Sequence, residues 1–67
     1  MENATLLTND QAELLEKLKA LADENRLRVC GWLSEREHNV TQLAEMLNVT
    51  EPTVSHHLAK LREAGLV

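Results

Sequence analysis

The chain has 67 residues and a formal net charge of −4, and 43% of its residues are hydrophobic. This length predicts one domain that buries only about 60% of its unfolded surface, and one Trp with no Phe or Tyr predicts an aliphatic core. A lone cysteine excludes an intrachain disulfide, and the absence of a long apolar run or a signal-peptide pattern predicts a cytoplasmic protein without membrane association.

The first predicted elements are a loose arm over residues 1–7 and a helix over residues 8–22. Thr8 followed three residues later by Gln11 is a capping-box pattern, which marks the start of a helix. Apolar side chains then recur at helical spacing and predict one apolar stripe along this helix, made of Leu14, Leu15, Leu18, Leu21 and Ala22.

The next predicted helix covers residues 24–34, with Asp23 as its N-cap. Three of its apolar residues recur every third position and two more widen the band, which therefore contains Leu27, Cys30, Leu33, Val29 and Trp32. Gly31 in a helix costs up to about 1 kcal/mol relative to alanine, so we expect close helix packing to require it. Residues 35–39 contain no apolar side chain and predict a loop.

Two short helices separated by a tight polar turn are predicted over residues 41–47 and 51–64. Ala44 lies on the apolar side of the first, where a small side chain lets two crossing helices approach closely. Asn48 occupies the turn position at which φ tends to be positive, a conformation that Asn tolerates better than most residues. Thr50 is a good N-cap for the second helix. This spacing is typical of a helix-turn-helix.

At about 100° per residue, Val54, Leu58 and Leu61 form a narrow buried arc on the second helix, and His57 flanks it. Gly65 is expected to end the helix. The outward side at the helix start carries small side chains that can reach base edges in a major groove about 12 Å wide. The predicted base-reading residues are Thr53, Ser55 and His56, the predicted phosphate contacts are Lys60 and Arg62, and Thr50 and His57 complete the predicted DNA-binding set.

Two segments of the chain resemble, in order, parts of the ArsR/SmtB family of winged helix-turn-helix repressors. They are LKALADENRLRVCGWL at 18–33 and VTQLAEMLNVTEPTVSHHLAKLREAGLV at 40–67. The resemblance implies dimeric binding to a DNA operator, with recognition positions at Thr53, Ser55, His56 and His57. Helical geometry turns His57 toward the edge of the core, so we interpret it as a flanking residue. The predicted fold is all-α, a small helical bundle of about four helices of the winged-helix type.

The chain also departs from the pattern of that family. In the family a β-hairpin wing begins where this chain reaches residues 66–67, and a helix after the wing supplies much of the dimer interface. We expect the wing to be truncated here. Metal-responsive members often carry a cysteine cluster at or beside the helix corresponding to 41–47, where this chain has Val40, Thr41, Gln42 and Leu43. We therefore predict no metal site and no cofactor.

Other chemical functions find little support in the residues. Cys30 with the three histidines would be enough ligands for zinc, but they lack the tight pair spacing of known zinc sites. We therefore interpret Cys30 as a small core residue. The sequence has no Gly-rich phosphate loop, no Cys and His in a nucleophile setting and no paired carboxylates that would indicate catalysis. An enzyme is not predicted.

The net charge of −4 opposes DNA binding, because affinity for DNA depends on Lys and Arg that neutralise phosphates. The charge is uneven, however, since Lys60 and Arg62 stand against Glu63 alone after Pro52. We expect the acidic residues before Pro52, with Glu51 among them, mostly to face away from DNA. The prediction is a sequence-specific DNA-binding domain of weak affinity. The alternative is a helix-turn-helix module for protein interaction or assembly without DNA binding.

Overall fold

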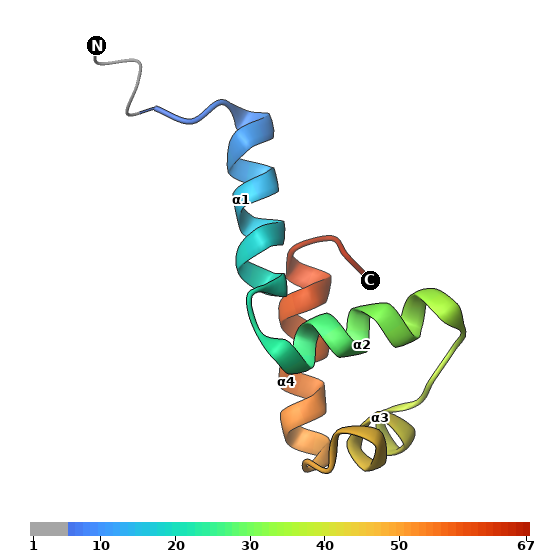
Figure 1. The fold of residues 1–67 in the computed structure, drawn as a ribbon. Helices are drawn as coiled ribbons and strands as arrows, with labels where there is room; N and C mark the ends of the chain where they lie inside the picture. Colours follow the sequence, from blue (N-terminus) through green and yellow to red (C-terminus); the bar gives the residue numbers. More distant parts are fainter. Residues whose placement is uncertain (1–5) are drawn as a thin grey trace.

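A computed structural model describes residues 6–67, which form four α-helices and no strand within that range (Figure 1). The all-α class predicted from the sequence is confirmed. Residues 1–5 of the predicted arm lie outside the described residues, and residues 6–8 have no regular secondary structure. The helices are α1 (Asn9–Leu21), α2 (Glu24–Glu35), α3 (Val40–Leu47) and α4 (Glu51–Glu63).

Every helix begins at a side chain that accepts a hydrogen bond from the backbone of its first turn. Thr8, Asp23 and Thr50 act as the N-caps that the sequence predicts for α1, α2 and α4. The cap of α3 was not predicted: Asn39 accepts from the Gln42 N–H at 2.8 Å, and the Gln42 side chain accepts from the Asn39 N–H at 2.9 Å. This reciprocal capping box starts α3 one residue earlier than predicted.

The last two helices both end at a residue with a left-handed backbone. Asn48 follows α3 with φ of 56°, and Gly65 follows α4 with φ of 75°, as the sequence predicts for both. After Asn48, the Val49 N–H donates to the Ala44 carbonyl at 3.1 Å. This is the Schellman arrangement, and it satisfies a backbone carbonyl that the end of α3 would otherwise leave without a partner.

The core is aliphatic, and α4 runs through its centre. Helix α4 packs against each of the other three helices, and these contacts enclose the core (Figure 1). Four side chains are fully buried, one from α2, one from α3 and two from α4, namely Val29, Leu43, Val54 and Leu61. Ala20, Ala44 and Leu58 complete the buried cluster.

The periodic apolar residues of α2 do not all face the core. Val29 is fully buried, whereas Leu27 is 57% exposed. The reason for Gly31 was also predicted wrongly, because a Cβ built on that glycine would meet nothing within 4 Å. Close helix packing therefore does not require Gly31. Cys30 is half-buried and packs against the core, in keeping with its interpretation as a small core residue.

Helix α1 projects beyond the other three helices (Figure 1), and Ala20 and Leu21 near its end contact the core. Its one buried residue is Ala20. The side chains of Leu14 and Leu18, from the predicted apolar stripe, are 55% and 54% exposed. Ala20 lies six residues after Leu14, which places it roughly 120° around the helix from that leucine. Leu14, Leu15 and Leu18 of the predicted stripe are therefore exposed, whereas Leu21 packs against the core.

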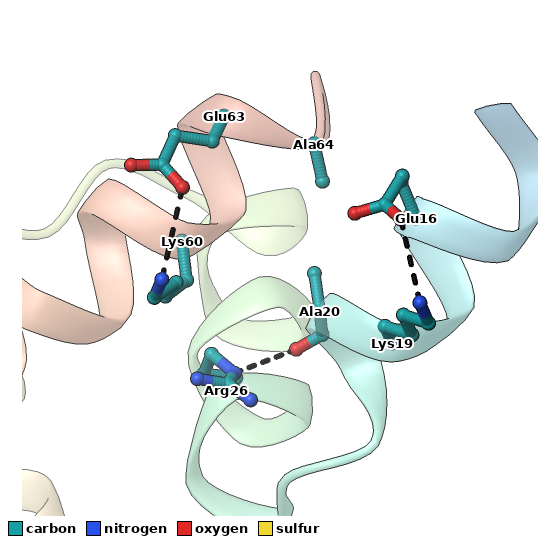
Figure 2. Close-up of a pocket in the computed structure, with 7 residues that line it drawn as sticks. All are labelled: Glu16, Lys19, Ala20, Arg26, Lys60, Glu63 and Ala64. Atoms are coloured by element: carbon teal, nitrogen blue, oxygen red, sulfur yellow. Dashed lines mark hydrogen bonds and ion pairs between the residues drawn. The ribbon is translucent and has the colours of Figure 1, made fainter.

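A short hydrogen bond joins the end of α1 to α2 at the junction of three helices. Arg26 Nε donates to the Ala20 carbonyl at 2.7 Å, so an arginine side chain satisfies a carbonyl in the last turn of α1 (Figure 2). The junction leaves an open pocket of about 320 Å³ between α1, α2 and α4. Its other charged side chains form ion pairs within their own helices, Lys19 with Glu16 and Lys60 with Glu63.

The carboxylate that caps α2 makes the stability of the fold depend on pH. The Arg26 N–H donates to Asp23 at 3.0 Å and holds the pKa of Asp23 below its usual value. Burial opposes this shift in the pKa of Asp23, and electrostatic interactions with His57 and Arg26 add to it. A lowered folded-state pKa stabilises the fold above the unfolded pKa of about 3.9, and this stabilisation is lost as the pH falls through the folded pKa.

We predict that Asp23→Ala lowers the free energy of unfolding by about 1 kcal/mol at pH 7, because it removes the cap of α2. Urea titrations should give a difference from wild type that decreases below about pH 4. Asp23→Asn is the control, since it keeps a capping oxygen without a titrating charge. Its difference from Asp23→Ala should not change with pH. A wild-type advantage that persists unchanged at pH 2 would contradict this account.

Candidate nucleic-acid interface

Helices α3 and α4 are joined by a three-residue turn, residues 48–50, and α3 lies across the N-terminal end of α4 (Figure 1). Ala44 of α3 is buried with 7% exposure in the same core cluster as residues of α4, and a side chain this small favours a close crossing of two helices. Val49, in the turn, packs against the core cluster. A small residue at the crossing, a left-handed Asn48 and a capped second helix together make a helix-turn-helix.

One side of α4 holds the helix against the body of the protein. Val54, Leu58 and Leu61 are buried as predicted. His57 is also buried, with 7% exposure, and its Nδ1 has no hydrogen-bond partner. It lies three residues after Val54, so helical geometry places it on the same face. His57 therefore cannot reach a base edge and is removed from the predicted DNA-binding set.

The six other predicted contact residues are solvent-exposed and are distributed around the remaining surface of α4 and its N-cap. These are Thr50, Thr53, Ser55, His56, Lys60 and Arg62. The rings of the adjacent His56 and His57 are tilted by 53° with centroids 6.1 Å apart, so one imidazole points outward while the other is buried. The exposed set runs from the start of α4 to its last turn.

The first turn of α4 is held together by paired threonine hydroxyl groups. Thr50 Oγ1 accepts from the Thr53 N–H at 3.3 Å, and the two hydroxyl oxygens lie 2.9 Å apart. Thr53 is therefore part of the cap as well as a candidate contact. A hydroxyl group has one donor and two acceptor positions, so this bond leaves Thr53 hydrogen-bonding capacity toward a ligand.

The two basic side chains of α4 are exposed on opposite flanks of the helix, roughly 160° apart, and are largely free to bind anions. Lys60 Nζ lies 3.9 Å from Glu63 Oε2, with both side chains well exposed, and such surface pairs contribute little free energy. Arg62 forms no ion pair with any residue in 6–67. The cations stand in the second half of α4, behind the small polar residues of its first turns.

Glu51 is exposed and is the first residue of α4, as the sequence predicts. The expectation that the acidic residues before Pro52 mostly face away from DNA stays a prediction. The hydroxyl of Thr41, on α3, donates to Glu51 Oε1 at 3.4 Å. The spacing of Glu51 and Ser55, four residues apart in the sequence, could have indicated that the two residues lie on the same strip of α4.

The described part of the chain offers no alternative site for metal chemistry. Among residues 6–67, no group of three or more His, Cys, Asp or Glu side chains could hold a metal ion. None of the helices in this part has the length and apolar character needed to cross a membrane. The exposed residues of α4 are therefore the candidate site.

The fold thus defines a helix-turn-helix domain with a polar, partly basic outer face on its second helix. The chain belongs to the family described as "Bacterial regulatory protein, arsR family", which residues 23–67 match. This family is the one that the two sequence segments resemble, so the recognition from sequence is confirmed.

Curated relatives agree with this assignment. The HTH-type transcriptional regulator KmtR of Mycobacterium tuberculosis is 47% identical over 62 residues, which cover 91% of this chain and 48% of KmtR. The arsenical resistance operon repressor of Escherichia coli is 44% identical over 54 residues, covering 79% of this chain and 46% of the repressor. The transcriptional activator HlyU of Vibrio cholerae is 35% identical over 65 residues, covering 97% and 60%.

The chain spans about half the length of the curated relatives it matches. These relatives are named as regulators of transcription and not as enzymes. Both an activator and a repressor are among them, so family membership leaves the sign of regulation open. No solved structure gives a significant match to the chain.

Proposed function

We propose that this chain is the sequence-specific DNA-binding domain of a transcriptional regulator, and that α4 is its recognition helix. The observation that carries the proposal is the division of α4 into two faces. Val54, His57 and Leu58 fix one face in the core, while Ser55 and His56 stand exposed between them on the other. A helix held in this way can enter the major groove without disturbing the core.

The proposed roles follow from the chemistry and place of each exposed side chain. Thr53, Ser55 and His56, near the start of α4, would contact base edges through hydroxyl and imidazole groups. Lys60 and Arg62, in the later turns, would contact phosphates, which fix the register on DNA without reading sequence. Thr50 would contact the backbone beside the groove and hold the first turn in place.

The charge of the chain supports only modest affinity. Two exposed cations on α4 offer few phosphate contacts, and the chain as a whole carries a net charge of −4. Because counterion release dominates DNA affinity, binding should weaken with added salt and should depend strongly on each of the two cations. A regulator of bacterial genes would act in the cytoplasm, where the chromosome is accessible.

We predict that the double variant His56→Glu with Lys60→Glu loses binding to duplex DNA, because it places two negative charges against the groove and the phosphates. Fluorescence anisotropy at low salt measures the loss, and circular dichroism should report unchanged helicity. The matched control compares Lys60→Glu with Arg28→Glu, an equal charge change at an exposed residue of α2. Lys60→Glu should weaken binding more. Retention of DNA by the double variant would reject the groove assignment.

We also propose that the chain pairs with a second copy, so that two recognition helices read two half-sites about one helical turn apart. The support is the exposed leucine side of α1, where Leu14 and Leu18 are 55% and 54% exposed, together with Leu7, which precedes the helix and is 57% exposed. Projecting leucines aligned on one side of a helix are costly to leave in water and are typical of a helix interface. A symmetric pair would bury both stripes at once.

We predict that Leu14→Glu with Leu18→Glu makes the protein monomeric, because it places charges in the proposed interface. Sedimentation equilibrium measures the change. Ala12→Glu is the control, since this exposed residue lies on α1 roughly 160° around the helix from Leu14. It should remain dimeric. A wild-type protein that stays monomeric at all concentrations tested would contradict the pairing. The DNA-binding role of α4 does not depend on this result, because the His56 and Lys60 variants test it separately.

A further inference from the structure

The first residue of α4 is acidic, which is unusual at the leading edge of a helix proposed to approach DNA. Glu51 is exposed and directly follows the N-cap Thr50. Its carboxylate stabilises the N-terminal end of the helix, where the backbone dipole is positive. The same position would otherwise attract a DNA phosphate. An acidic side chain here therefore reduces general affinity for DNA.

The carboxylate of Glu51 is also held in place by a neighbouring helix. The Thr41 hydroxyl of α3 donates to Oε1 at 3.4 Å, and no hydrogen bond engages Oε2 within the described residues. Glu51 and Ser55 are four residues apart, so they are neighbours on one strip of α4. The carboxylate consequently stands one turn ahead of a proposed base-reading residue, on the same side of the helix.

An ionised carboxylate accepts hydrogen bonds and donates none. In the major groove the matching donors are the amino groups at N4 of cytosine and N6 of adenine, and cytosine N4 is the usual partner of a glutamate. The oxygen atoms of guanine and thymine would instead face the carboxylate with an acceptor. A fixed acceptor at the leading turn therefore favours a base pair that presents cytosine at that step.

We propose that Glu51 is a specificity-determining residue that selects cytosine in the major groove and lowers binding to unrelated sequence. The inference rests on the proposed function of α4. Glu51 acts in two ways that reinforce each other: it accepts from the cytosine amino group at a matching site, and it repels phosphates where no such group is within reach. Specificity then comes partly from weakened competing complexes.

The test is parallel selection of bound duplexes from a random DNA library by the wild type and by Glu51→Gln. Glutamine pairs with adenine through N6 and N7, so one position should change from cytosine to adenine, with a preference of roughly tenfold in each case. Binding of Glu51→Gln to unrelated duplex should be about threefold tighter. Thr41→Val, which frees the carboxylate, should keep cytosine at that position with a weaker preference.

The matched control is Glu13→Gln, which makes the same charge change on exposed α1, at the far end of the molecule from the start of α4 (Figure 1). It should select the wild-type sequence. Wild-type enrichment with the same preference in Glu51→Gln would overturn this inference alone. A wild type that enriches no sequence would overturn the proposed function and this inference with it. Circular dichroism should report the same helicity for every variant.

Discussion

The close approach of α3 and α4 at Ala44 is the constraint on which the rest of the structure depends. Only a small side chain fits between crossing helices, and the left-handed Asn48 reverses the chain so that Val49 packs into the core beside them. The crossing fixes the rotation of α4 about its own axis. That rotation decides which residues of α4 are buried and which can meet a ligand.

The same helix therefore serves stability and recognition through side chains that are adjacent in the sequence. His56 and His57 have the same chemistry, but one is exposed and the other is buried with an unpaired Nδ1. Their different places result from the roughly 100° step between neighbours on a helix, and not from residue type. Helix α1 has a different arrangement, because Leu14 and Leu18 face away from the core, while Ala20 and Leu21 near its end contact it.

Features that depend on local chemistry could be predicted from the sequence. The caps at Thr8 and Asp23, and the left-handed residue Gly65, each require only a few neighbouring residues. Features that depend on how the helices pack against one another could not be predicted from the sequence. The spacing of Leu27, Cys30 and Leu33 is as regular as a core stripe, yet Leu27 is exposed, Cys30 and Leu33 are only partly buried against the core, and Val29 is fully buried. The position of Glu51 at the start of α4 was predicted, but its hydrogen bond with Thr41 depends on the crossing of α3 and was not.

The most direct test of the helix crossing is Ala44→Leu compared with Ala59→Leu, an equal enlargement on the exposed side of α4. Urea unfolding should give Ala44→Leu a loss of about 1 to 3 kcal/mol, because the larger side chain forces the helices apart. Ala59→Leu should stay within about 0.5 kcal/mol of wild type. An Ala44→Leu protein as stable as wild type would contradict the account, because α4 would then not depend on a close crossing for its orientation.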